Sequence, residues 1–479
     1  MNNKLMMPDS YCQKKKSSFR ITISLLVILI MPACMQRGTD NLPALKVSDN
    51  HRFLATADDD PFFWLGDTGW LLFSKLTREE TEQYLENRKQ KGFNVIQVMV
   101  LHGVRNVVNV YGDTALVDGK VDKPVITPGN NFEDPAQYDF WDHIDYVVDL
   151  AAKKGIYMGL VPVWGSNVRG GQVSGEEAGR YAVWLAERFK NRNNIIWLNG
   201  GDVKGSDSLR VWNIIGNTIR RNNPDQLITF HPFGRTQSSE WFHNENWLDF
   251  NMFQSGHRRY DQDTTDLAYG EDNWKYAQYD YSLVPVKPTI DGEPSYEGIP
   301  QGLHDTTQPY WTDNEVRRYA YWSVFAGCCG FTYGHSAIMQ FYRPGDNPGY
   351  GAKEYWTAAM DAPGASQMKY LRDLILSKPY FERIPANELL AGEQGTKYDY
   401  IAITRGEDYL FGYTWNGNNI SLDMSKLPWT NYSIKWFDPR NGTFSSAGNA
   451  ANDGMVTFNP PGDKENGNDW VLVLEKIRI

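Results

Sequence analysis

The chain has 479 residues, enough for two or three domains of ordinary size, or for one large domain with a small companion. Hydrophobic residues make up 41% of the sequence and charged residues 22%, which is typical of a globular protein and excludes a disordered or fibrous one. The net charge of −10 at pH 7 would repel the phosphates of nucleic acids, so we expect no nucleic-acid partner.

Residues 1–33 have the pattern of a secretion signal. Lysines at positions 14–16 and Arg20 precede an apolar run at residues 21–30, which is shorter than the roughly 20 residues a membrane-spanning helix needs. An alanine then precedes Cys34, as at a bacterial lipoprotein cleavage site. We therefore expect residues 1–33 to be removed, Cys34 to be lipidated and residues 34–44 to form a tether. An ordinary signal peptide cut nearby is the alternative.

The predicted location follows from this anchor. Two or three acyl chains on Cys34 would hold the protein stably at a membrane of the bacterial cell envelope, with no other membrane contact expected. The residues after Cys34 lack an acidic cluster, which favours the periplasmic face over the cell surface. Of the other cysteines, Cys328 and Cys329 are adjacent and have apolar neighbours, so we expect them to be buried thiols and not a disulfide.

From residue 62 onward, short β-rich runs alternate with helical stretches, which is typical of parallel strands joined by crossover helices. Several runs are continuously apolar, as expected of strands that are covered on both faces. There are eight such runs, at Phe62–Asp67, Phe93–Leu101, Ile156–Trp164, Asn194–Asn199, Gln226–Pro232, Asp249–His257, Pro288–Glu293 and Gly330–His335.

The helical stretches carry their own end signals. Thr77 and Glu80 have the spacing of a capping box, and Gly92 ends that helix before the second run. Eight strand and helix units in about 270 residues predict an α/β protein with a (β/α)8 TIM barrel at residues 45–383. The alternative is an open doubly wound sheet, but no Gly-x-Gly-x-x-Gly follows the first run. Short alternating strands separated by turn residues predict a β-sandwich at residues 384–479.

A TIM barrel carries its active site at the carboxyl ends of its strands, so polar residues there are candidates for function. One strand-end histidine is more often a packing residue than a functional one. Several histidines at the same end of the barrel make a functional role for the group more probable than for any one of them alone. The candidate substrate-binding residues at these ends are Asp67, His102, Asn199, His231, His257 and His335.

Two carboxylates stand out at the barrel mouth. Asp202 follows the fourth run after two glycines, and Glu293 ends the seventh run between a glycine and a proline. Glycoside hydrolysis needs one protonated and one ionised carboxyl group, and strands four and seven face each other across a barrel. The plainer alternatives are that Asp202 caps a helix or that Glu293 forms an ion pair. Asp291 and Glu297 compete with Glu293 for the second role.

Aromatic side chains support a sugar ligand, because tryptophan and tyrosine rings stack on the apolar faces of sugar rings. The candidate platforms are Trp164, at the end of the third run, and Trp241 or Trp247, after the fifth. The long segment from Val104 to Phe132, between the second run and its helix, is expected to shape the pocket. The sequence contains no His-Glu-x-x-His motif and no cysteine spacing typical of a zinc site, and we expect neither a cofactor nor a metal.

Several motifs resemble the apiosidase-type glycoside hydrolases, glycoside hydrolase family 140. They are Pro61–Trp70, Arg88–Gln97, Asn199–Asp202, Gln254–His257, Asp291–Pro294 and Gly330–His335. The resemblance spans the barrel and includes the β-sandwich. It implies that Asp202 is the acid/base and Glu293 the nucleophile of a retaining enzyme, and it adds Tyr333 to the candidate substrate-binding residues.

The resemblance also implies a substrate. The family is associated with gut bacteria that release apiose-linked side chains from the pectic polysaccharide rhamnogalacturonan II, so the expected partner is an oligosaccharide or polysaccharide. Two other hypotheses remain open from the sequence. One is a non-catalytic glycan-binding lipoprotein, whose binding would survive loss of both carboxylates. The other is a metal-dependent sugar isomerase, which would lose activity with a chelator.

Overall fold

The computed structural model describes residues 42–478. The predicted signal peptide at residues 1–33, the lipidation site Cys34 and most of the tether at residues 34–44 lie outside this range, so those expectations stay predictions. Within residues 42–478, no helix combines the length and the apolar character that crossing a membrane requires.

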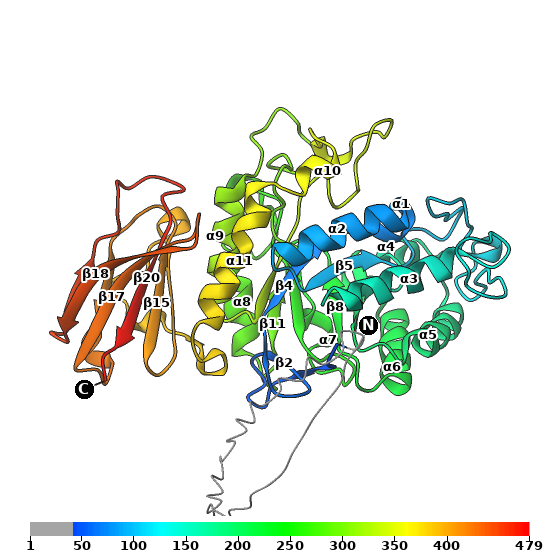
Figure 1. Cartoon of the computed structure of the whole chain (residues 1–479). Helices are drawn as coiled ribbons and strands as arrows, with labels where there is room; N and C mark the ends of the chain where they lie inside the picture. Colours follow the sequence, from blue (N-terminus) through cyan, green and yellow to red (C-terminus); the bar gives the residue numbers. More distant parts are fainter. Residues whose placement is uncertain (1–41, 479) are drawn as a thin grey trace, which may run out of the picture. The chain divides into compact units, whose positions relative to one another are not determined.

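The central sheet is a TIM barrel, as predicted (Figure 1). Its eight parallel strands run in the order β8-β7-β6-β5-β4-β12-β11-β10, and most of their residues are buried because helices cover the outside and side chains fill the inside. The strands are β4 (Trp64–Thr68), β5 (Val95–Met99), β6 (Tyr157–Val161), β7 (Ile195–Val203), β8 (Ile228–Pro232), β10 (Asn251–Gln254), β11 (Thr289–Asp291) and β12 (Gly330–Tyr333).

The barrel closes between β8 and β10 without a regular ladder. The Thr229 hydroxyl donates to the Phe250 carbonyl at 2.7 Å, and the Asp249 amide donates to the Ile228 carbonyl at 2.9 Å. A ninth strand, β9 (Thr236–Gln237), pairs antiparallel with β10 and was not expected from the sequence. Three short strands ahead of the barrel, β1 (Leu45–Val47), β2 (Leu54–Thr56) and β3 (Pro61–Phe62), form a separate antiparallel sheet.

Helices connect the barrel strands, and several begin with a side-chain cap. The expected capping box between Thr77 and Glu80 is present at the start of α2, and Ser174 and Glu177 form another at α5. The helices are α1 (Leu72–Lys75), α2 (Arg78–Gln90), α3 (Phe140–Lys153), α4 (Gly165–Arg169), α5 (Gly175–Phe189), α6 (Leu209–Asn222), α7 (Ser239–Phe242), α8 (Asn273–Ser282), α9 (Asp313–Phe325), α10 (Trp356–Ala359) and α11 (Pro363–Leu376).

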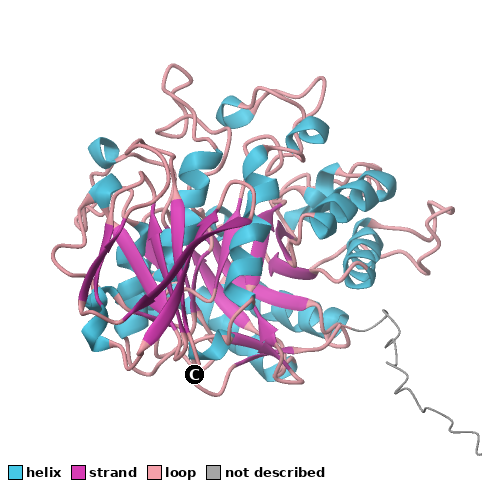
Figure 2. Cartoon of the chain, turned by 60° about the vertical axis from the view of Figure 1, so that its left-hand side comes forward, coloured by secondary structure: helices cyan, strands magenta, loops and turns pink. Residues whose placement is uncertain are grey.

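The C-terminal part is a β-sandwich, also as predicted (Figure 2). A six-stranded sheet in the order β13-β14-β15-β20-β17-β18 and a two-stranded sheet of β16 and β19 share an apolar core that includes Ile403, Leu422 and Leu474. The strands are β13 (Ile384–Pro385), β14 (Ile401–Arg405), β15 (Tyr409–Thr414), β16 (Ile420–Asp423), β17 (Asn431–Asp438), β18 (Thr443–Ala451), β19 (Met455–Phe458) and β20 (Trp470–Lys476).

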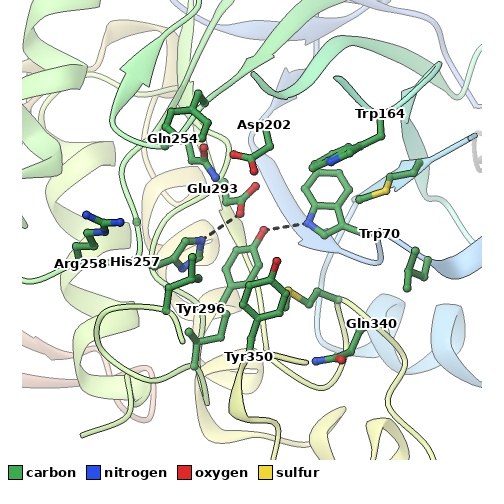
Figure 3. A pocket seen from close by; sticks show the side chains of 18 of the residues that line it. Trp70, Trp164, Asp202, Gln254, His257, Arg258, Glu293, Tyr296, Gln340 and Tyr350 are labelled. Atoms are coloured by element: carbon green, nitrogen blue, oxygen red, sulfur yellow. Dashed lines mark hydrogen bonds and ion pairs between the residues drawn. The ribbon is translucent and has the colours of Figure 1, made fainter. Parts of the chain in front are cut away.

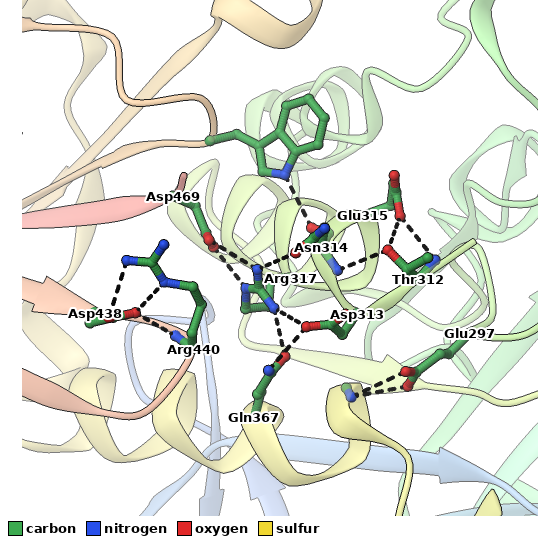
Figure 4. Close-up of polar contacts among 12 residues, drawn as sticks. Glu297, Thr312, Asp313, Asn314, Glu315, Arg317, Gln367, Asp438, Arg440 and Asp469 are labelled. Carbon is green, nitrogen blue, oxygen red and sulfur yellow. Dashed lines mark hydrogen bonds and ion pairs between the residues drawn. The ribbon is translucent and has the colours of Figure 1, made fainter. Parts of the chain in front are cut away.

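The barrel and the β-sandwich are joined by a buried ion pair. Arg317 of α9 donates two hydrogen bonds to the carboxylate of Asp469, at 2.9 and 3.0 Å, and both side chains are fully buried (Figure 4). Trp274 of α8 stacks on Tyr400 with ring centroids 4.2 Å apart. A bidentate arginine–carboxylate pair fixes direction as well as distance, so this contact holds α9 in one orientation against the β-sandwich.

Candidate active site

A cavity of about 270 Å³ lies at the carboxyl ends of the barrel strands, where TIM-barrel enzymes place their chemistry (Figure 3). Asp202 and Glu293 both line it. Trp70 and Trp164 form one side of the cavity, and His257 and Arg258 lie on the other side of the two carboxylates. The cavity therefore places two acidic groups between an aromatic wall and a polar wall.

Asp202 reaches the cavity because strand β7 bulges there. The register between β7 and β8 shifts between Gly200 and Val203, so the intervening residues leave the ladder. Gly200 has a φ of +92°, and a Cβ atom at this position would lie 2.6 Å from the ring of Phe230. Only glycine fits this turn, which lifts the side chain of Asp202 out of the strand and into the barrel mouth.

Glu293 lies just beyond the end of β11 and is held by two histidines. His257 Nε2 donates to Glu293 Oε1 at 3.1 Å, and His231 Nε2 lies 3.1 Å from Oε2. The backbone amide of Asp202 donates to His231 Nδ1 at 3.4 Å. Since Nδ1 then acts as an acceptor, the ring proton of neutral His231 is on Nε2, facing the carboxylate. His231 thus links the backbone of one acid to the side chain of the other.

The two carboxyl groups have opposite pKa shifts. Burial raises the pKa of Asp202, and the negative charge of Glu293 raises it further. Burial alone would also raise the pKa of Glu293, but hydrogen bonds from His231 and His257 outweigh it and hold the pKa below its usual range. Asp202 is therefore suited to hold a proton and Glu293 to stay ionised, which is the division of labour that glycoside hydrolysis requires.

The aromatic wall is built around His231. The rings of Trp70 and Trp164 lie 5.2 and 6.0 Å from the imidazole, and 5.4 Å from each other. Trp70 Nε1 donates to the Tyr296 hydroxyl at 3.2 Å, so the edge of this ring is fixed. Such a wall can pack on the apolar face of a sugar while the carboxylates act on its polar edge.

Comparisons with known proteins agree with this geometry. Residues 48–382 match the family model described as "Apiosidase-like, catalytic domain", which is more than half of the chain. The chain belongs to the apiosidase-like family. Residues 384–475 match a second model, named for a collagen-binding domain of a collagenase.

Solved structures place this apiosidase-like protein among the glycosidases. One titled "Glycoside hydrolase" is 44% identical, with a TM-score of 0.85 over 91% of this chain and 97% of the other. A glycoside hydrolase family 5 protein from Bacteroides vulgatus is 42% identical, with a TM-score of 0.85 over 90% and 92%. A search of curated protein sequences returned no match. The protein is a glycoside hydrolase, which rules against the non-catalytic and isomerase hypotheses.

The cavity of this apiosidase-like protein is lined by only some of the substrate-binding residues expected from the sequence. His102, Trp164 and His257 line it together with the two carboxylates. Partial desolvation at the cavity wall lowers the pKa of His102, which favours its neutral imidazole. His231 is fully buried behind Glu293 and does not line the cavity. It therefore acts on the carboxylate and not on a ligand.

Besides His231, four of the expected substrate-binding residues do not line the cavity, which corrects that expectation. Each is buried and engaged elsewhere. Asp67 pairs with Arg88 at 2.6 Å and accepts from Tyr84, the Asn199 amide donates to the Trp212 carbonyl, the Tyr333 hydroxyl donates to Glu297, and His335 accepts from the Ala337 amide. All four lie in a barrel strand or just after one, but their side chains pack within the barrel and do not reach the cavity.

The two competitors of Glu293 are also accounted for. Asp291 is fully buried and accepts hydrogen bonds from Ser255 at 2.5 Å and Asn273 at 2.9 Å. Glu297 accepts from Tyr333 at 2.6 Å and from the Gly364 amide at the start of α11. Neither lines the cavity, so the geometry selects Glu293 as the partner of Asp202.

The segment from Val104 to Phe132 was expected to shape the pocket, and this expectation is wrong. None of its residues lines the cavity. It packs instead beside α2, where the guanidinium of Arg78 lies 4.7 Å from the ring of Tyr111 and 4.6 Å from that of Phe132.

Several residues of the cavity were not singled out from the sequence. Trp70 and Gln254 stood inside motifs that resemble the family, so those motifs carried a usable signal. Tyr296 and Tyr350 follow no strand directly, and nothing in their local sequence marks them. Across residues 42–478, no group of three or more His, Cys, Asp or Glu side chains is arranged to hold a metal ion.

Proposed function

We propose that this glycoside hydrolase releases apiose-linked side chains from a pectic glycan of the rhamnogalacturonan II type, with retention of anomeric configuration. The observation that carries the proposal is the pairing of Asp202 and Glu293 in one cavity with opposite pKa shifts. The match of residues 48–382 to the apiosidase-like model supports the choice of sugar.

The proposed reaction has two steps. Glu293 attacks the anomeric carbon and forms a glycosyl ester, while Asp202 gives its proton to the departing glycosidic oxygen. Asp202, now ionised, then removes a proton from a water molecule, which attacks the same carbon and frees the Glu293 carboxylate. The raised pKa of Asp202 suits the first step, because the group must enter it protonated.

The test compares wild-type protein with Asp202→Ala and Glu293→Ala. Each is incubated with rhamnogalacturonan II and with its partly trimmed side chains, and released sugars are identified by chromatography. Release of apiose-ended products by wild type alone supports both the acid pair and the sugar. Nuclear magnetic resonance of the first product formed gives the anomer, and inversion would refute the double-displacement mechanism.

We also propose that Cys34 anchors the protein to a membrane of the cell envelope, on the periplasmic side. The support is the sequence pattern of residues 1–34. Fractionation of cells that express wild type or Cys34→Ser tests this. The substituted protein is expected in the soluble fraction, and protease added to intact cells should leave the wild-type protein uncut.

A further inference from the structure

Tyr350 is an exposed aromatic residue that lines the cavity, and its backbone is strained. It lies in the turn at Gly349–Gly351, in the long connection between β12 and α10, and has φ and ψ angles of 52° and 35°. Tyrosine rarely adopts this left-handed conformation, which costs on the order of 1 kcal/mol and persists only where the surroundings impose it. Something in the surroundings must therefore hold the turn.

Gln340 provides that restraint. Its amide nitrogen donates to the Gly349 carbonyl at 2.8 Å, and its amide oxygen accepts from the Gly349 backbone N–H at 2.9 Å. The same nitrogen donates to the Ser336 carbonyl at 2.7 Å, which ties the side chain to the segment that follows β12. Gln340 thus holds both polar groups of the residue before Tyr350, and the turn cannot relax without breaking this clamp.

The phenol of Tyr350 faces the catalytic acids. Figure 3 shows its hydroxyl pointing toward Glu293 and Tyr296 from below. Partial desolvation of the phenol against the cavity raises the pKa of Tyr350, and the charges of Asp202 and Glu293 raise it further, so the hydroxyl keeps its proton. The ring is stacked against His304, with centroids 5.0 Å apart. Within residues 42–478 the hydroxyl has no hydrogen-bond partner, so it is free to bind a ligand.

We propose that Tyr350 is a substrate-binding residue whose hydroxyl forms a hydrogen bond with a hydroxyl group of the sugar held between Asp202 and Glu293. Gln340 is the positioning residue that keeps Tyr350 in this orientation before the sugar arrives. Because the hydroxyl of Tyr350 is already in position, sugar binding does not lose conformational entropy in ordering this side chain. Sugars that place a hydroxyl group at this point are therefore selected. The inference rests on the proposed function, because it requires a glycan in the cavity.

The first experiment measures kcat/KM for Tyr350→Phe on the substrate that wild type hydrolyses. Loss of one hydrogen bond between neutral groups is expected to lower kcat/KM about 3- to 10-fold. Tyr355→Phe is the matched control, because Tyr355 lies in the same connection, packs against Tyr342 with the rings tilted and does not line the cavity. It should keep the wild-type kcat/KM. A wild-type kcat/KM for Tyr350→Phe would overturn the proposal.

The clamp is tested by a double-mutant cycle. Gln340→Ala should lower kcat/KM in the wild-type background and have a much smaller effect in the Tyr350→Phe background, because both changes remove the same contact. Equal effects in both backgrounds would mean that Gln340 does not act through Tyr350. Circular dichroism confirms that each variant is folded.

A binding measurement separates this inference from the proposed function. Free apiose is titrated while the intrinsic tryptophan fluorescence of the protein, to which Trp70 and Trp164 contribute, is followed. If wild type hydrolyses no pectic substrate but binds apiose more tightly than Tyr350→Phe does, the proposed reaction fails and the role of Tyr350 stands. Equal affinities overturn the role of Tyr350, and no binding by wild type overturns both.

Discussion

His257→Ala tests the electrostatic argument for Glu293 most directly. The substitution removes the hydrogen bond that His257 Nε2 donates to Glu293 Oε1 at 3.1 Å. A hydrogen bond to a charged group contributes about 1.5 to 3 kcal/mol, and one pKa unit corresponds to about 1.4 kcal/mol. The ionised form of Glu293 loses this stabilisation and the protonated form does not. The pKa of Glu293 should therefore rise by about one to two units.

The consequence appears in the pH profile. Glu293 must be ionised to attack, and its pKa is depressed in the wild type, so activity is lost as the pH falls through that low value. In His257→Ala the acid limb of kcat/KM moves to higher pH by the same one to two units. The alkaline limb, which reports the raised pKa of Asp202, should move much less. The assay uses the natural glycan across the full pH range, because its leaving group needs the proton of Asp202 and both limbs are then seen.

His257→Gln is the matched control, because its side-chain amide can donate to the same carboxylate oxygen. It should shift the acid limb less than His257→Ala does. Thermal unfolding of each variant shows whether the fold is intact. An acid limb that stays in place in folded His257→Ala would refute the reasoning, since Glu293 would then owe its low pKa to other groups.

Three further outcomes follow from the contacts. Asp202→Ala should lower kcat about 100- to 10,000-fold on a natural glycan, and far less on an aryl glycoside whose leaving group needs no proton. Equal losses of kcat on both substrates would exclude Asp202 as the acid. Asp67→Asn leaves Arg88 buried without its counter-ion, so it should lower the free energy of unfolding by denaturant by about 3 to 5 kcal/mol and leave KM unchanged. A changed KM with wild-type stability would mean that Asp67 does bind the substrate. Arg317→Met should cost a similar amount by stranding Asp469; a cost below about 1 kcal/mol would show that the pair is not buried in solution.

The barrel could be predicted because its strands are continuously apolar and its helices carry local end signals. The position of Asp202 at the barrel mouth could be predicted as well, because two glycines before an acidic residue at a strand end indicate a sharp turn. These features act through residues that are adjacent in the chain, so the sequence displays them directly.

The errors have one physical source. A strand end places a residue at the barrel mouth but does not decide which way its side chain points. Asp67 turns toward Arg88, and Tyr333 toward Glu297, because partners from distant elements accept them there. Tyr350 was missed for the same reason, since its position depends on a clamp from Gln340. Pairings across the fold leave no trace in the local pattern.

The ion pair between Arg317 and Asp469 has a consequence for how the protein matures. Arg317 belongs to α9, the helix just before the last barrel strand β12, whereas Asp469 follows it 152 residues later, just before β20. A chain is synthesised from its N-terminus, so α9 is made well before Asp469. Until then Arg317 has only barrel partners, which are Asp313, Asn314 and Gln367. The two hydrogen bonds that fix α9 against the β-sandwich therefore form only after Asp469 has been made.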